Sequence, residues 1–141
     1  MDKYVVDASV AVALVLPDEP YYSHASALFE GFAKEKLELV TVPLFIFEVC
    51  NALWKAVQRG RIEFPAAVEA ARRIAELRIP SRAVSIEAML DIAHEHKRTA
   101  YDAAYLALAL QEKAPLVTAD RRLYNALEGR FELIRWIESA A

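Results

Sequence analysis

Residues 101–110 read Tyr101-Asp102-Ala103-Ala104-Tyr105-Leu106-Ala107-Leu108-Ala109-Leu110, a strongly helix-forming run that is apolar on almost every side and contains one carboxylate. A helix that is apolar all round is normally buried, so we expect this one to lie in the core. An ionised carboxylate at the entrance to a core is costly unless a cation, a metal or hydrogen-bond donors compensate it. Asp102 is therefore either the acid of a capping box that begins at Thr99, or part of a polar site.

The composition is that of a compact, helix-rich globular protein. The chain has 141 residues, of which 56% are hydrophobic and 26% charged, and only three are glycine. We therefore expect a single domain that spans residues 1–141. The one cysteine, Cys50, permits no internal disulfide, and its apolar neighbours predict a buried side chain in a reducing compartment. The formal net charge of -3 gives no general attraction to nucleic acid.

The N-terminus has a superficial likeness to a signal peptide, because a lysine precedes a run rich in valine and alanine. Asp7 in the middle of that run argues against a signal peptide. No uninterrupted apolar stretch is long enough to span a bilayer. We therefore expect a soluble, cytoplasmic protein without a membrane partner.

Hydrophobic patterning predicts strands that alternate with helices. Strands are expected at residues 3–7, 37–42, 78–84, 115–118 and 131–134, the third of them only at an edge because it contains Pro80. Helices are expected at residues 8–16, 23–34, 44–58, 64–77, 86–96, 101–113 and 120–127. This alternation predicts one α/β domain with a mainly parallel sheet.

Two acids stand where strands are expected to end. Asp7 closes the first strand and Asp120 follows the strand at residues 115–118. Functional groups of open α/β sheets gather at the carboxyl ends of the strands. Each of these acids is also an ordinary N-cap for the helix that follows it, so either one alone is uninformative.

Glu48 is harder to explain as a structural residue. Glu48 and Asn51 are the only polar residues from Leu44 to Trp54, and their i, i+3 spacing places them on one face of a helix. Such a glutamate either forms a buried ion pair, for which Lys55 is available, or helps to build a polar site. We favour the site, because Asn51 lies beside Glu48.

These acids would repel one another if they met without a cation. A hard divalent metal resolves that conflict, since Mg²⁺ and Mn²⁺ choose oxygen ligands and need neither cysteine nor histidine. The three histidines show no zinc-like spacing. A carboxylate cluster that holds one or two such ions suits phosphodiester cleavage by a metal-activated water. Motifs of serine hydrolases, P-loop NTPases and dinucleotide-binding proteins are missing from the sequence, which disfavours those classes.

Four short segments follow one another in a characteristic order: residues 5–9 (VVDAS), 48–53 (EVCNAL), 101–109 (YDAAYLALA) and 116–123 (LVTADRRL). Together they resemble the PIN domain and, within it, the VapC-type toxins of prokaryotic toxin–antitoxin pairs. Each motif is short, but their order and the length of the chain make the match specific. The similarity runs from Lys3 to about Ile134.

The resemblance implies a Mg²⁺- or Mn²⁺-dependent endoribonuclease with a three-layer fold, in which a twisted, mainly parallel five-stranded sheet is flanked by helices. It implies a catalytic and metal-binding site of four acids: Asp7, Glu48, Asp102 and Asp120. It implies a set of polar residues that support them: Ser9, Asn51 and Thr118. Asp120 is the position at which such families vary most. An RNA substrate, homodimerisation, and inhibition by a small antitoxin whose tail enters the acidic groove are further family expectations.

Other classes compete with this interpretation. A catalytically inactive PIN-like domain that binds RNA or a partner would keep the fold, but the intact set of four acids counts against it. A signalling receiver domain would need paired acids after the first strand and a late lysine, where this chain has Asp7 alone and Thr118. A phosphatase with an Asp-x-Asp nucleophile is disfavoured because Ser9 occupies its second position.

Overall fold

The computed structural model describes residues 1–140 and has the α/β architecture that the sequence predicts. Its sheet consists of β1 (Lys3–Val6), β2 (Glu38–Val40), β3 (Leu116–Thr118) and β4 (Ile134–Trp136). The strands are all parallel, in the order β2-β1-β3-β4. β1 is therefore a central strand, and its residues Tyr4, Val5 and Val6 are 4%, 0% and 0% exposed. Burial on both faces accounts for the uninterrupted apolar run in this strand.

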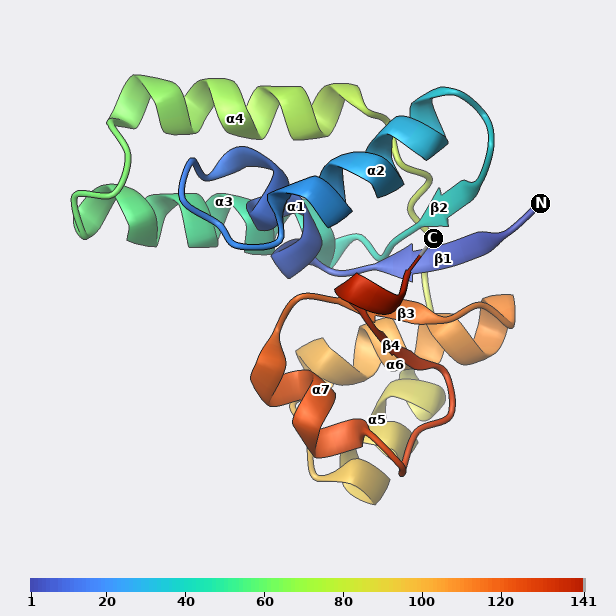
Figure 1. Ribbon diagram of the computed structural model, residues 1–141. Coiled ribbons are helices and arrows are strands. Elements are labelled where there is room, and N and C mark those ends of the chain that lie inside the picture. The colour runs from blue at the N-terminus through green and yellow to red at the C-terminus, as the bar shows by residue number, and fades with distance from the viewer. Residues whose placement is uncertain (141) are drawn as a thin grey trace.

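Helices cover the strands on both sides. They are α1 (Ala8–Val15), α2 (Tyr22–Ala33), α3 (Leu44–Gln58), α4 (Phe64–Glu76), α5 (Ile86–His96), α6 (Ala100–Glu112) and α7 (Arg121–Leu127), with a final short 3-10 helix at Ile137–Ser139. In Figure 1, α1 to α4 lie in the upper part of the view, with β1 and β2, and α5 to α7 lie in the lower part, with β3 and β4. Among residues 1–140, no helix has both the length and the apolar character that a membrane span requires.

The helix predicted at residues 101–113 is confirmed as α6 and lies in the core. Its residues from Ala103 to Ala109 are all buried. The helix begins at Thr99, whose side chain accepts a hydrogen bond from the backbone N–H of Asp102. It ends at Lys113, which adopts the left-handed conformation with φ of 53°. The packing of α6 therefore fixes where Asp102 and its neighbours emerge from the core.

The prediction of five strands is wrong, because residues 78–84 form no strand. This segment meets the sheet at a single parallel bridge between Thr41 and Ser81. Two backbone hydrogen bonds accompany the bridge, from Thr41 N to the Pro80 carbonyl and from Arg82 N to the Thr41 carbonyl, each 2.9 Å long. Proline has no N–H to donate, so the ladder does not extend past Pro80. The described residues therefore form a sheet of four strands.

The expected burial of Cys50 is also wrong. α3 turns one face to the core with Phe45, Val49 and Leu53, and Cys50 lies on the other, exposed face. Trp54 is 51% exposed on that helix too. An apolar run longer than a helical turn cannot bury every side chain of a helix that packs on one side only.

Candidate active site

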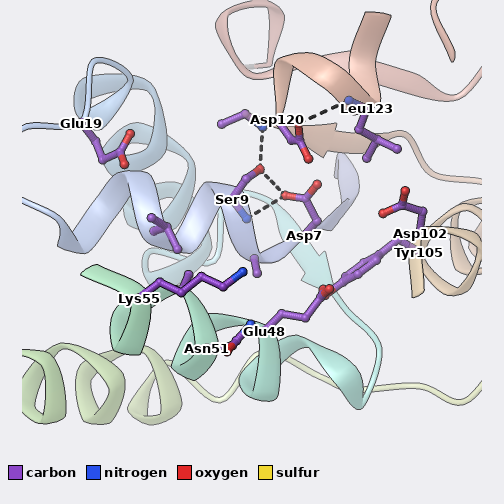
Figure 2. A pocket seen from close by; sticks show the side chains of 14 residues that line it. Asp7, Ser9, Glu19, Glu48, Asn51, Lys55, Asp102, Tyr105, Asp120 and Leu123 are labelled. Atoms are coloured by element: carbon purple, nitrogen blue, oxygen red, sulfur yellow. Dashed lines mark hydrogen bonds between the residues drawn. The ribbon is translucent and has the colours of Figure 1, made fainter. Parts of the chain in front are cut away.

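A pocket of about 480 Å³ opens where the carboxyl ends of β1 and β3 meet α3 and α6. All four predicted acids line it, as do Ser9 and Asn51 (Figure 2). Thr118 lies just behind the pocket wall and is fully buried. The fold thus brings residues together that are up to 113 positions apart in the chain, as the difference between 7 and 120 shows.

Asp7 is the most deeply placed of the acids, with 6% of its surface exposed. Its Oδ1 accepts hydrogen bonds from the backbone N–H of Ser9 at 3.0 Å and from the Ser9 hydroxyl at 2.5 Å. Its Oδ2 accepts a hydrogen bond of 2.6 Å from the Thr118 hydroxyl. Asp7 is also the N-cap of α1, as its position before a helix predicted. The hydrogen bond that caps α1 therefore holds the Asp7 carboxylate at the pocket, and the role of N-cap is compatible with a role in a site.

The same two hydroxyl groups connect Asp7 to the loop after β3. The Ser9 oxygen accepts a hydrogen bond of 2.8 Å from the N–H of Ala119, and the Thr118 oxygen accepts one of 3.0 Å from the N–H of Asp120. Each of these hydroxyl groups thus donates its proton to Asp7 and accepts an N–H of the β3–α7 loop with its lone pairs.

Burial raises the pKa of Asp7 from 3.8 to about 6. The hydrogen bonds from Ser9 and Thr118 oppose this rise, and the nearby charge of Asp120 adds to it. The ionised form of Asp7 is thus costly in the absence of a cation.

Asp120 caps α7 as the sequence suggested. Its Oδ1 accepts hydrogen bonds from the backbone N–H groups of Arg122 at 3.0 Å and Leu123 at 3.3 Å. The residue is exposed, and its carboxylate borders the pocket. Within residues 1–140, Oδ2 of Asp120 accepts no protein hydrogen bond and remains available to a ligand.

Glu48 points from α3 into the pocket and accepts a 2.6 Å hydrogen bond at Oε1 from the hydroxyl of Tyr105. The ion pair with Lys55 that the sequence allowed does not form among residues 1–140. Partial burial raises the pKa of Glu48; the Tyr105 hydrogen bond lowers it, and the charges of Asp102 and Asp120 raise it further. The polar-site interpretation of Glu48 is therefore the one that its surroundings support.

Asp102 has the compensating cation that its position near the core requires. Nη2 and Nε of Arg98 donate to its Oδ2 at 3.0 Å and 3.2 Å. Thr99 caps the helix beside it, but the capping box is incomplete, because neither carboxylate oxygen of Asp102 accepts the N–H of Thr99 among the described residues. Oδ1 of Asp102 accepts no hydrogen bond among the described residues, and the side chain is 28% exposed at the pocket.

The donor set fits a hard divalent cation better than any other metal. The pocket supplies carboxylate, hydroxyl and amide oxygens, and neither histidine nor cysteine lines it. Three carboxylates keep one oxygen without a protein donor: Glu48, Asp102 and Asp120. No three acidic, histidine or cysteine side chains within residues 1–140 are grouped closely enough to ligate one ion together as they stand. Mg²⁺ usually keeps several waters and binds through one or two carboxylates, so the pocket suits it without such a group.

Three further charged or polar residues line the pocket and were not predicted as site residues: Glu19, Lys55 and Tyr105. Tyr105 follows Asp102 by three positions, a spacing that shares a helix face and could have identified it. Lys55 follows Asn51 by four and could have been identified in the same way. Glu19 comes from the loop after α1, and no sequence pattern marks it.

Comparison with known proteins shows that this chain is similar to PIN-domain proteins. The PIN domain matches residues 4–128. Ribonuclease VapC3 of Pyrobaculum aerophilum is 36% identical over 125 residues, which cover 86% of this chain and 92% of that protein. Exonuclease VapC9 of the same organism is 29% identical over 131 residues, covering 93% and 90% respectively.

Solved structures share the fold. The crystal structure of PAE2754 from Pyrobaculum aerophilum superimposes with a TM-score of 0.74 and 26% identity, covering 98% of this chain and 91% of that one. VapC20 of Mycobacterium tuberculosis, described as a toxin that cleaves the sarcin-ricin loop, gives a TM-score of 0.62 at 17% identity, with coverage of 94% and 98%. The second likeness concerns the fold alone.

The buried charge of Asp7 predicts how the metal-free protein responds to pH. The pKa of Asp7 is about 6 in the folded protein and 3.8 in the unfolded chain. Between these pH values the folded protein keeps a proton that the unfolded chain releases. The contribution of Asp7 to the free energy of unfolding therefore falls as pH rises from 4 to 6. Asp7→Asn removes this loss. The free energy of unfolding of Asp7→Asn relative to wild type should therefore rise from pH 4 to pH 8, by on the order of 3 kcal/mol for two pKa units.

Urea unfolding of both metal-free proteins across this pH range measures the difference. Asp2→Asn serves as the control, because Asp2 is exposed and outside the pocket. A difference between Asp7→Asn and wild type that does not change with pH would contradict the burial cost assigned to Asp7.

Proposed function

This chain belongs to the PIN-domain family of nucleases, and on that premise we propose that it is a metal-dependent endoribonuclease and the toxin of a toxin–antitoxin pair. The observation that carries the proposal is the meeting of four acids from separate elements in one pocket at the carboxyl ends of the strands. The relative named ribonuclease supports RNA as the substrate. The alternative is a catalytically inactive PIN-like domain that binds RNA or a partner.

Asp7, Glu48, Asp102 and Asp120 would hold the cation, which is Mg²⁺ or Mn²⁺, one or two of them directly and the others through its bound waters. Such an ion supplies a nucleophile by lowering the pKa of a bound water, and offsets the charge that develops on the attacked phosphate. Ser9 and Thr118 keep the Asp7 carboxylate directed at the pocket through their hydroxyl protons. Asn51 offers an amide on the same face of α3 as Glu48.

Lys55 has a separate role toward the substrate. It is the one lysine or arginine that lines the pocket in the described part of the chain, and Figure 2 shows its ammonium group directed inward. No acid within residues 1–140 forms an ion pair with it. An RNA phosphate that approaches an acidic pocket needs such a cation, and we assign the contact with a phosphate oxygen to Lys55.

As a toxin of this kind, the protein would act in the cytoplasm and bind two protein partners, a small antitoxin and a second copy of this chain. Exposed aromatic residues on the outer face of α3 and at the start of α4 support a protein partner: Phe47, Trp54 and Phe64 are 70%, 51% and 58% exposed. Apolar side chains that gather on a surface are typical of protein interaction sites.

Cleavage of RNA tests the proposal directly. Purified protein should cut a mixed, structured RNA pool with Mn²⁺ or Mg²⁺ and not with EDTA, and Asp7→Asn and Asp102→Asn should each lower the rate by at least about 100-fold, since each removes a charge that holds the ion. Asp91→Asn, on an exposed position of α5, should leave the rate unchanged. A circular RNA should also be cut, because an exonuclease needs an end. Full activity in EDTA or in Asp102→Asn would refute the proposed centre, and a folded protein that binds RNA but never cuts would favour the inactive alternative.

Metal binding should stabilise the fold. An ion that binds only the native state adds about 2.7 kcal/mol at a concentration 100 times its Kd. Excess Mn²⁺ should therefore raise the melting temperature of wild type over that measured in EDTA, and the rise should shrink in Asp102→Asn. Calorimetry with and without the ion provides the measurement; equal melting temperatures for wild type would count strongly against a metal site.

Replacing Lys55 should weaken substrate binding more than chemistry. Lys55→Met is expected to raise KM for RNA, and to reduce the slope of log affinity against log salt concentration by about one, as for the loss of one phosphate contact. Lys36→Met, an exposed lysine that does not line the pocket, is the matched control. An unchanged KM and salt slope in Lys55→Met would exclude the phosphate contact.

A further inference from the structure

One hydrogen bond joins the side chains of α3 and α6 across the pocket. The hydroxyl of Tyr105 lies 2.6 Å from Oε1 of Glu48 (Figure 2). No other side-chain hydrogen bond connects these two helices among residues 1–140. The position of Glu48 relative to α6 therefore depends on this contact.

Glu48 is otherwise free to leave the pocket. It stands in the middle of α3, caps no helix, is partly exposed, and forms no ion pair among the described residues. A glutamate has three side-chain torsions, and ordering a long side chain costs conformational entropy. Without a partner, this carboxylate would sample solvent as well as the pocket.

Tyr105 is a fixed donor. Its ring is 2% exposed in the most buried part of α6, so packing determines where its hydroxyl lies. An ionised carboxylate has no proton to give, so the tyrosine donates and the carboxylate accepts. The bond engages Oε1 of Glu48 and leaves Oε2 without a protein donor among residues 1–140.

Tyr105 also stands one turn after Asp102 on the same helix, at the i, i+3 spacing that shares a face. α6 thus carries one acid of the pocket itself and reaches a second acid on α3 through a tyrosine. A group that orients a metal ligand in this way changes metal affinity without touching the metal.

We infer that Tyr105 is a positioning residue: it holds Glu48 toward the pocket and thereby sets the affinity of the site for its divalent cation. This inference rests on the proposed metal site. It assigns Tyr105 a role that packing alone does not require, since phenylalanine would fill the same volume.

Direct titration with Mn²⁺ tests the inference without recourse to activity. Electron paramagnetic resonance of free Mn²⁺ gives the dissociation constant for metal-free wild type, Tyr105→Phe and Tyr4→Phe. Loss of an orienting partner typically weakens metal binding by about 10- to 100-fold, and we expect this for Tyr105→Phe. Tyr4→Phe removes a hydroxyl from another buried tyrosine, in β1 and outside the pocket, and should bind as wild type does.

A double-mutant cycle identifies Glu48 as the intermediary. If Tyr105 acts through Glu48, then Tyr105→Phe should cost little further affinity in a Glu48→Gln background. Circular dichroism and the melting temperature of each metal-free variant show that the fold is kept. Loss of the fold in Tyr105→Phe would assign the hydroxyl to stability and overturn the inference.

The outcomes separate this inference from the proposed function. If Tyr105→Phe binds Mn²⁺ as tightly as wild type, or weakens binding equally in wild type and in Glu48→Gln, the role of Tyr105 is overturned while the nuclease proposal stands. Failure of wild type to bind Mn²⁺ would remove both. Weakened binding in Tyr105→Phe alone, which disappears in the Glu48→Gln background, is the result that supports the inference.

Discussion

Asp7 ends the central strand with a carboxylate that is 6% exposed, and a charge so placed must be met by hydrogen-bond donors or a cation. The donors come from two places in the sequence, Ser9 at the start of α1 and Thr118 at the end of β3. Their oxygens then accept N–H groups from the loop that leads into α7. Satisfying one buried carboxylate therefore aligns β1, α1 and β3 and the entrance to α7, and it places Asp120 beside Asp7.

The acids that lie at helix starts in this structure are also acids that line the pocket. Asp7, Asp102 and Asp120 each stand at or near a helix start, where free N–H groups attract carboxylates. These helix starts face one pocket because the parallel strands all end on that edge. A sequence that shows N-caps after strands thus also shows where a site can form, and the two interpretations do not exclude each other.

The sequence predicted what local patterns encode. The seven α-helices and the apolar strand β1 followed from periodicity and capping chemistry, and six of the residues that line the pocket, the four acids with Ser9 and Asn51, followed from the family resemblance. The prediction of a strand at residues 78–84 was wrong because Pro80 leaves only one bridge to the sheet. The predicted burial of Cys50 was wrong because the helices around α3 determine which of its faces turns to the core. The contact of Tyr105 with Glu48 joins residues 57 positions apart, and periodicity within one helix carries no information on such distances.

Glu48 distinguishes a functional cluster from a structural one. Asp7 and Asp120 each cap a helix and Asp102 pairs with Arg98, whereas Glu48 caps nothing and has no cation beside it. Burial and the charges of Asp102 and Asp120 both raise its pKa, so its ionised form opposes folding in the absence of a metal. A glutamine there would accept the same tyrosine proton without that cost. A ligand that requires the charge would explain the glutamate at this position, and the divalent cation that we propose for the pocket is such a ligand.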